Sequence, residues 1–126
     1  MERRFQIWGL LFGLTAVIIG AFGAHALKEV LTEVQQASFE TGIRYQMYHA
    51  ILLLFISLKP NFQNKLILNL AVIGVFLFSF SIYFLNLRQM LDLEFLSFLG
   101  PVTPIGGLLL ISTWSILLIK VVQSKT

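Results

Sequence analysis

The sequence predicts an all-α membrane protein, a four-helix transmembrane bundle that forms a single domain over residues 1–126. Hydrophobic residues make up 57% of the 126-residue chain and charged residues only 12%, against roughly 25% charged in an ordinary soluble domain. The charged residues are concentrated between four long apolar runs. These runs lack the period-two alternation of a membrane β-barrel, so each is interpreted as a helix.

The apolar runs place the spans at about residues 5–27, 41–58, 66–87 and 103–120. A helix needs about 20 residues to cross a hydrocarbon core about 30 Å thick, and the first, third and fourth runs supply that length. The second run is shorter. Its helix is expected to begin near Thr41 and to carry Arg44 just inside the interface, where a long basic side chain reaches the headgroups.

The segment between the first two spans has a helical pattern of its own. Val30, Leu31 and Val34 recur at helical spacing opposite charged residues, which predicts a short amphipathic helix on the membrane surface. Thr32 and Gln35 have the spacing of a capping box at a helix start.

The last run is interrupted near its start by Gly100, Pro101 and Pro104. Proline is tolerated in the first turn of a helix because it has no amide hydrogen to donate there. The last helix is therefore expected to begin near Pro104, with Thr103 as its cap.

The distribution of basic residues predicts the orientation. An even number of spans places both termini and the loop 59–65 on one side, and the positive-inside rule assigns the more basic side to the cytoplasm. We therefore expect a multi-pass protein of the cell (inner) membrane with both termini in the cytoplasm. The terminal side carries Arg3, Arg4, Lys59, Lys65, Lys120 and Lys125, whereas the other side carries Lys28, Arg44 and Arg88 beside five acidic residues.

A second interpretation of the N-terminus stays open. Arg3 and Arg4, an apolar stretch and the tripeptide 24–26 (Ala-His-Ala) together resemble a secretory signal with a small-residue cleavage site. Cleavage would leave three spans. The apolar run exceeds the usual core of about 7 to 15 residues, which favours retention.

Small residues line one face of the first predicted helix, and a second group lies in the last span. In lipid, helices associate through close backbone approach, so such a face predicts helix packing. It packs either within the chain or in a dimer, and the group in the last span is a candidate docking site for the first helix. The residues are Gly9, Gly13, Ala16, Gly20 and Ala24 in the first span, and Gly106 and Gly107 in the last.

Polar side chains collect in the outer halves of the spans. Thr41, Tyr45 and His49 share one helix face, with His49 roughly 10 Å below the outer end of its helix. Two interpretations stay open: a hydrogen-bond network that fixes helix register, or a shallow outward pocket for a headgroup, a small metabolite or a proton. The candidate polar cluster consists of His25, Arg44, Tyr45, Gln46, His49 and Thr103.

Several function classes are disfavoured. The absence of cysteine removes disulfides and thiolate metal sites, and two histidines without a nearby carboxylate fall short of a metal site. No nucleophile elbow or phosphate-binding glycine loop occurs, and the scattered basic residues do not predict nucleic-acid binding. We therefore expect a non-enzymatic protein without a cofactor, whose partner is membrane lipid. A homo-oligomer, an accessory subunit of a larger membrane complex, and an oligomeric transporter or channel are the alternatives.

Three stretches resemble the signatures of a known family. They are residues 20–27 (GAFGAHAL), 39–50 (FETGIRYQMYHA) and 103–107 (TPIGG). In this order they resemble the domain of unknown function 423 family, the YgdD-like and transmembrane protein 256-like small membrane proteins. The resemblance covers nearly the whole chain. It implies a small four-helix inner-membrane protein, carries no established activity, and falls on the residues of the candidate polar cluster.

Overall fold

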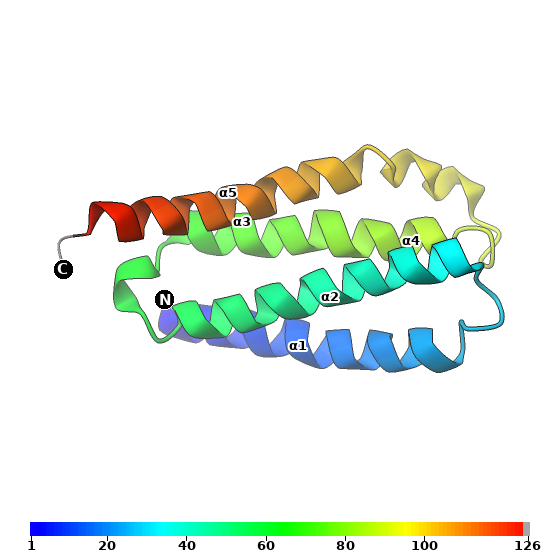
Figure 1. Cartoon of the computed structure of the whole chain (residues 1–126), viewed down its shortest axis with the longest axis horizontal. Coiled ribbons are helices and arrows are strands. Elements are labelled where there is room, and N and C mark those ends of the chain that lie inside the picture. Colours follow the sequence, from blue (N-terminus) through cyan, green and yellow to red (C-terminus); the bar gives the residue numbers. More distant parts are fainter. Residues whose placement is uncertain (125–126) are drawn as a thin grey trace.

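The computed structural model describes residues 1–124 and consists of helices that run back and forth along one axis (Figure 1). Both chain termini lie at the same end, called here the terminal end, together with the turn Pro60–Phe62; the opposite end is called the loop end (Figure 1). Lys125 of the predicted basic set lies outside the described residues. The main elements are α1 (Glu2–His25), α2 (Glu33–Ile56), α3 (Lys65–Val75), a π-helical segment (Phe76–Phe80), α4 (Ser81–Leu87), a 3-10 segment (Glu94–Leu99) and α5 (Val102–Gln123).

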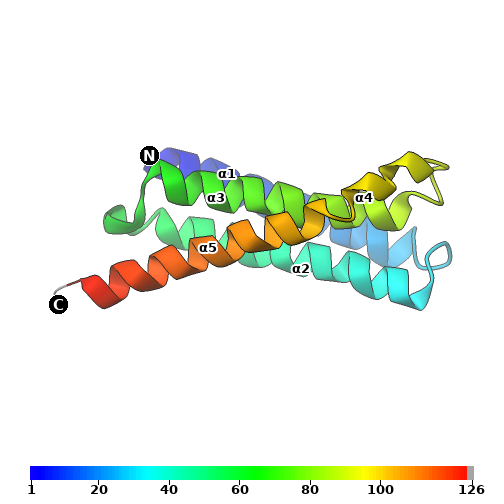
Figure 2. The ribbon, with the colours of Figure 1, turned by 90° about the horizontal axis from the view of Figure 1, so that it is seen from above.

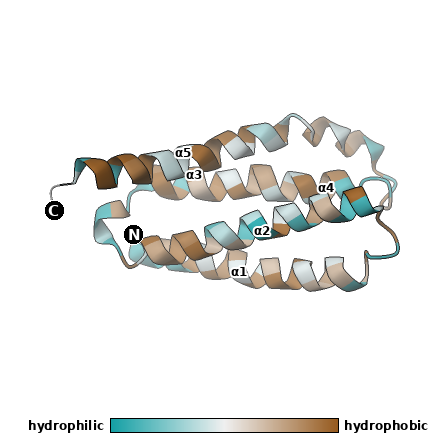
Figure 3. Ribbon diagram, viewed as in Figure 1, coloured by the Kyte–Doolittle hydropathy of each residue, from teal (hydrophilic) through white to brown (hydrophobic). Residues whose placement is uncertain are grey.

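Three segments are long and apolar enough to cross a membrane: Glu2–His25, Lys65–Leu87 and Glu94–Gln123. The second of these, called here the third span, joins α3, the π-helical segment and α4. α2 has 24 residues, as many as α1, but polar residues extend into its middle (Figure 3). Length and apolarity therefore support three of the four predicted spans directly.

The prediction of a separate amphipathic helix between the first two spans is wrong. α2 begins at Glu33 and continues without a break to Ile56, because no proline interrupts the chain where the amphipathic pattern meets the apolar run. The predicted capping box is confirmed: the Oγ1 of Thr32 accepts from the amide of Gln35, and the side chain of Gln35 accepts from the amide of Thr32. The amphipathic segment is thus the first part of α2.

α1 packs against α2 through its small residues. A Cβ atom at Gly9 would lie 2.8 Å from the Cγ of Leu54, and one at Gly23 would lie 2.8 Å from the ring of Phe39. Ala16 is also buried, whereas Ala24 is exposed. Gly13 and Gly20 are half-buried beside Ala50 and Ile43 of α2. The predicted small-residue face therefore packs within the chain except at Ala24, and Gly23, outside that face, adds a further close contact.

α5 packs against the third span at the π-helical segment. A Cβ atom at Gly106 would lie 2.8 Å from the Cα of Phe78, so the two backbones are in direct contact. Gly107 lies beside the Phe78 ring at a more ordinary distance of 3.6 Å. The predicted docking site at Gly106 and Gly107 thus receives the third span and not the first helix.

The start of the last helix differs slightly from the prediction. α5 begins at Val102, and Pro104 lies in its first turn as expected. Thr103 is not the cap, because it lies inside the helix and its Oγ1 is 2.5 Å from the Oγ of Ser81. Ser81 in turn donates to the carbonyls of Leu77 and Phe78, the first of them at 2.6 Å. The hydroxyl of Ser81 therefore donates to backbone carbonyls of the π-helical segment, where the usual α-helical hydrogen bonding is interrupted.

Candidate functional site

Gln46 is completely buried and forms a closed hydrogen-bond network between three helical segments. Its Nε2 donates to the carbonyl of Phe12 at 2.9 Å and to the Oγ1 of Thr15 at 2.7 Å, both on α1. Its Oε1 accepts from the hydroxyl of Tyr83 on α4 at 2.7 Å. The amide thus uses both of its donor hydrogens and its acceptor oxygen within the protein. This geometry matches the predicted network that fixes helix register.

A second buried contact joins α2 to the third span. Ser79, in the π-helical segment, donates from its Oγ to the carbonyl of Gly42 at 2.7 Å. Gly42 lies under the ring of Tyr83, since a Cβ atom there would be 2.7 Å from its Cε1. The small side chains at these two positions let α2 approach closely enough for the bond to form.

His49 forms the bridge between α2 and α5. Its Nδ1 lies 2.7 Å from the carbonyl of Tyr45, and its Nε2 lies 3.0 Å from the Nε1 of Trp114. A carbonyl can only accept and an indole N–H can only donate. The bonds therefore assign a neutral imidazole with its proton on Nδ1, in which neither ring nitrogen is free.

The other members of the predicted cluster do not converge on this pair. His25 is exposed at the end of α1, and Arg44 is exposed and bonds the Oγ1 of Thr41 on its own helix at 3.3 Å. Thr103 contacts Ser81 at the loop end. Tyr45 is partly exposed and lies beside the rings of His49 and Phe78. The structure therefore separates the cluster into the buried network of Gln46, the bridge at His49 with its neighbour Tyr45, the loop-end contact of Thr103, and two exposed side chains, His25 and Arg44.

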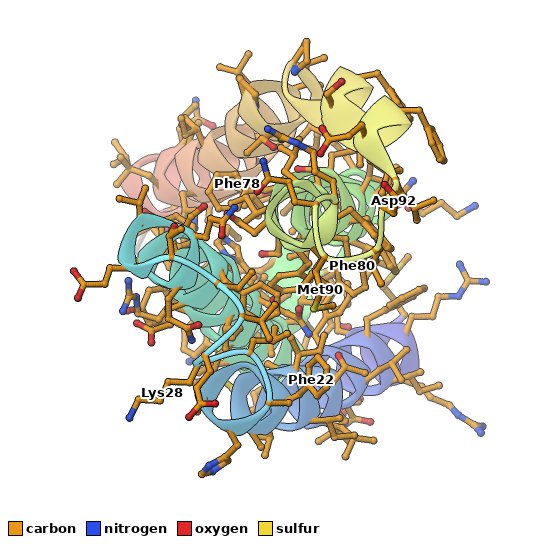
Figure 4. The ribbon with its side chains drawn as sticks, turned by 90° about the vertical axis from the view of Figure 1, so that its right-hand side faces the viewer. Phe22, Lys28, Phe78, Phe80, Met90 and Asp92 are labelled. Atoms are coloured by element: carbon orange, nitrogen blue, oxygen red, sulfur yellow. The ribbon has the colours of Figure 1, made fainter. Side chains whose placement is uncertain are left out.

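Phe78 and Phe80 lie on opposite sides of the third span. Figure 4 shows the bundle from the loop end, with Phe78 toward α2 and α5 and Phe80 toward α1. The ring of Phe78 is 4.8 Å from that of Tyr45, and Phe80 is 5.5 Å from Tyr83. The π-helical segment therefore fills both sides of the bundle centre with aromatic rings.

A hollow at the loop end contains polar residues that the sequence interpretation did not assign to a site. It has a volume of about 510 Å³ between α2, α4 and the start of α5, and Thr103 lines it. Asn86 donates there to the Oγ of Ser38 at 3.0 Å. The Nε of Arg88 is 3.6 Å from the Oε2 of Glu94, too long for a hydrogen bond. Arg88 was interpreted only as a topology signal, and the sequence gives no sign that α2 and α4 meet at this point.

A long groove separates α2 from α5. α5 crosses the third span obliquely (Figure 2) and contacts it along much of its length. Three adjoining hollows of about 410, 510 and 380 Å³ follow one another toward the terminal end and share lining residues. We call this feature the α2/α5 groove; its lining includes Tyr45, His49, Trp114, Leu52, Phe55, Leu117, Leu118, Phe62, Val121, Lys59 and Lys120.

The described residues contain no group of three or more potential metal ligands. The buried serines are engaged, since Ser79 donates to Gly42 and Ser81 donates to backbone carbonyls of its own span. Both nitrogens of His49 are also engaged. Within residues 1–124, Ser79, Ser81 and His49 therefore do not form a paired nucleophile and base of the kind used in covalent catalysis.

Comparison with known proteins identifies the family. A family model described as "Protein of unknown function (DUF423)" matches residues 19–107, which is more than half of the chain. The chain belongs to this family. The resemblance stated from the sequence motifs is thus confirmed. The matched region includes Gln46, Tyr83, His49 and the loop-end hollow, but not Phe12 and Thr15 of the buried network or Trp114 of the bridge.

Relatives in the DUF423 family match over nearly the full length. A "UPF0382 membrane protein" of Staphylococcus epidermidis is 38% identical over 125 residues, covering 96% of this chain and 97% of the relative. The "UPF0382 membrane protein YwdK" of Bacillus subtilis is 33% identical, covering 96% and 98%. The "UPF0382 inner membrane protein YgdD" of Escherichia coli is 29% identical, covering 99% and 95%. No solved structure matches the chain.

The names of the relatives agree with the apolar helices, so the chain is a membrane protein. These names assign no reaction, transport activity or complex to the family.

Proposed function

We propose that the protein is a non-enzymatic, multi-pass membrane protein that holds a bilayer lipid in the α2/α5 groove. The observation that carries this proposal is the continuity of the groove, which extends from Tyr45, beside the His49–Trp114 bridge, to the terminal end. In this proposal the buried polar network around Gln46 has a structural role. It holds α1, α2 and α4 in register while α5 stands apart from α2.

The rim of the groove supports a lipid as its occupant. Ile51 and Phe55 on α2 and Leu118 on α5 are between 47% and 64% exposed, which in a bilayer means exposed to hydrocarbon. A groove with such a rim opens sideways into the membrane. An acyl chain can enter it there without crossing a polar barrier.

In the same proposal α2 is the fourth span, and both termini face the cytoplasm of the inner membrane. α2 matches α1 in length and packs along it, and its central Gln46 is satisfied by other helices, as a polar group in hydrocarbon requires. The positive-inside rule supports the orientation, because the basic residues collect at the terminal end.

Native mass spectrometry of the protein released from a mild detergent tests lipid retention in the groove. A Leu118→Trp variant places a larger ring at the groove wall and is expected to carry less co-purified lipid. Ile111→Trp is the matched control, since Ile111 is also exposed on α5, at 62% against 64% for Leu118, but does not line the groove. Equal amounts of lipid on both variants and the unmodified chain would refute the proposal.

A second candidate function is recognition of a small anion from the loop end. The hollow there brings Arg88 together with the hydroxyl of Thr103, and the buried Nε of Arg88 lacks a hydrogen-bond partner, since the carboxylate of Glu94 with which it forms an ion pair lies 3.6 Å away. Isothermal titration with inorganic phosphate provides a direct test. Binding that disappears in Arg88→Gln but persists in Arg44→Gln, an exposed arginine outside the hollow, would support this function; the absence of any heat of binding would eliminate it.

A further inference from the structure

We propose that the α2/α5 groove selects an anionic phospholipid, with the phosphate held between Lys59 and Lys120 and one acyl chain extending along the groove toward Trp114. This inference rests on the proposed lipid-binding function and adds to it the chemical class of the lipid and its direction of entry.

The first support comes from the mouth of the groove. Lys59 follows the end of α2 and Lys120 lies in the last turns of α5, yet both line the same hollow of about 380 Å³ at the terminal end. The Nζ of Lys59 is 6.0 Å from the centre of the Phe55 ring, a groove residue. The ammonium of Lys59 therefore lies above the apolar wall of the groove. From there it can contact the phosphate of a lipid whose acyl chain lies in the groove.

The second support is the charge distribution. No acidic residue lines the mouth, and the only ion pair among the described residues, Arg88 with Glu94, lies at the loop end. The two lysines of the mouth are therefore available to an external anion. Of the six acidic residues of the chain, only Glu2, at the start of α1, lies at the terminal end. The other five lie toward the loop end: Glu29, Glu33, Glu40, Asp92 and Glu94.

The third support is the depth of the groove. Seven positions of α2 separate His49 from the last helical residue, Ile56, and six positions of α5 separate Trp114 from Lys120; each corresponds to about 10 Å at the rise of an α-helix. This distance is less than half of a hydrocarbon core about 30 Å thick. The part of the groove between the mouth and the His49–Trp114 bridge therefore lies within one leaflet, where an acyl chain entering from the terminal end would extend.

The same geometry argues against a helix from a second copy as the occupant. A spanning helix would have to cross both leaflets, whereas the bond between His49 and Trp114 joins α2 to α5 across the groove partway along both helices. A second copy would also have to neutralise Lys59 and Lys120, and Glu2 at the start of α1 is the only acidic side chain of the described residues at the terminal end.

The test uses full-length protein, delipidated in a nonionic detergent and titrated with phosphatidylglycerol or with phosphatidylcholine of the same chains. Native mass spectrometry measures the ratio of the two bound lipids. Each basic residue near an anionic headgroup contributes a factor of about five. The unmodified chain is therefore expected to prefer phosphatidylglycerol. In the double variant Lys59→Gln/Lys120→Gln the ratio of bound phosphatidylglycerol to bound phosphatidylcholine should fall by roughly 25-fold, while phosphatidylcholine still binds.

The controls separate the mouth from the general charge of this end. Arg3→Gln/Arg4→Gln removes the same charge at the start of α1 and should preserve the preference, as should the conservative Lys59→Arg/Lys120→Arg variant. Equal loss of preference in Arg3→Gln/Arg4→Gln, or no loss in the double lysine variant, would overturn the inference. Failure of the unmodified chain to bind either lipid would refute the proposed function itself, and a lipid-free dimer would assign the groove to a second copy.

Discussion

At the scale of single residues, the buried polar side chains are bonded to one another or to backbone carbonyls. Gln46 bonds to Phe12, Thr15 and Tyr83, and Ser79 bonds to Gly42. A polar group that lost its partner there would have no water to replace it. The effects of substituting two hydrogen-bonded partners on the free energy of unfolding should therefore be coupled and not additive.

A double-mutant cycle on Gln46 and Tyr83 tests this pairing. Gln46→Leu and Tyr83→Phe each remove the 2.7 Å bond between the two side chains. Tyr83→Phe is expected to lower the free energy of unfolding in detergent by about 1 kcal/mol, and Gln46→Leu by about 2–3 kcal/mol, because it also removes the bonds to Phe12 and Thr15. The double variant should lose less than the sum, with a coupling of about 0.6 and at most about 1.7 kcal/mol. Strictly additive losses would mean that the bond does not form.

Substitutions of His49 and Arg44 should have different effects on the free energy of unfolding, although both residues belong to the candidate polar cluster. Arg44→Leu is expected to change the free energy of unfolding by less than about 0.5 kcal/mol, because the side chain is exposed and bonds only within its own helix. His49→Leu should cost about 1 kcal/mol by removing the bridge to α5.

Trp114→Phe is the control for this comparison, because it keeps an aromatic ring at the bridge while removing the indole donor. Trp114→Phe should lower the free energy of unfolding by about as much as His49→Leu does. Thermal unfolding in detergent measures all three variants, and a destabilised Arg44→Leu beside a stable His49→Leu would contradict the bridge.

At the scale of helices, close backbone approach determines which segments are neighbours. Gly106 lets α5 contact the backbone of the third span at Phe78, and Gly9 and Gly23 let α1 contact α2. In lipid, where apolar burial gives little drive for association, such contacts provide much of the packing energy. Gly9, in the glycine face of α1, is thereby covered within the chain by α2.

Gly106→Ala and Gly107→Ala form a matched pair of adjacent substitutions. The added methyl at Gly106 would lie 2.8 Å from the Cα of Phe78, so a backbone must move, and a loss of about 1–3 kcal/mol is expected. At Gly107 the nearest atom is a ring carbon 3.6 Å away, so the change should be nearly neutral. The denaturation midpoints of the two variants measure this difference. Equal midpoints would mean that α5 does not contact the third span at Gly106.

Much of this helical organisation was predictable, because run length and cap chemistry are local properties. The capping box at Thr32 was identified correctly, but the start of the second helix was placed near Thr41 because its first turns are polar. The partner of Gly106 was not predictable. Small residues indicate that a helix packs closely, but not which neighbour it meets.

The candidate site was predicted less completely for a similar reason. Arg44 and Gln46 are two positions apart and therefore point to different sides of α2, so one is exposed and the other is buried. Their proximity in sequence made them resemble a cluster. The α2/α5 groove depends on how α5 crosses the third span, a relation between elements distant in sequence that no local pattern contains.

At the scale of the whole molecule, the arrangement divides the charges between two ends. Basic residues dominate the terminal end, whereas most acidic residues lie at the loop end. This division links the predicted orientation to the proposed lipid site, because it would place Lys59 and Lys120 at the cytoplasmic leaflet. Anionic lipids give that leaflet a negative surface potential.

The absence of cysteine from the chain allows the orientation to be tested directly. Single variants Glu29→Cys, Asn61→Cys and Met90→Cys place a thiol in each of the three connections between spans. If α2 crosses the membrane and both termini are cytoplasmic, a membrane-impermeant maleimide applied to intact spheroplasts should label Glu29→Cys and Met90→Cys, and should label Asn61→Cys only after lysis. Labelling of Glu29→Cys and Asn61→Cys from the same side would show that α2 does not cross, and labelling of Asn61→Cys alone would reverse the orientation and move the lysine mouth to the outer leaflet.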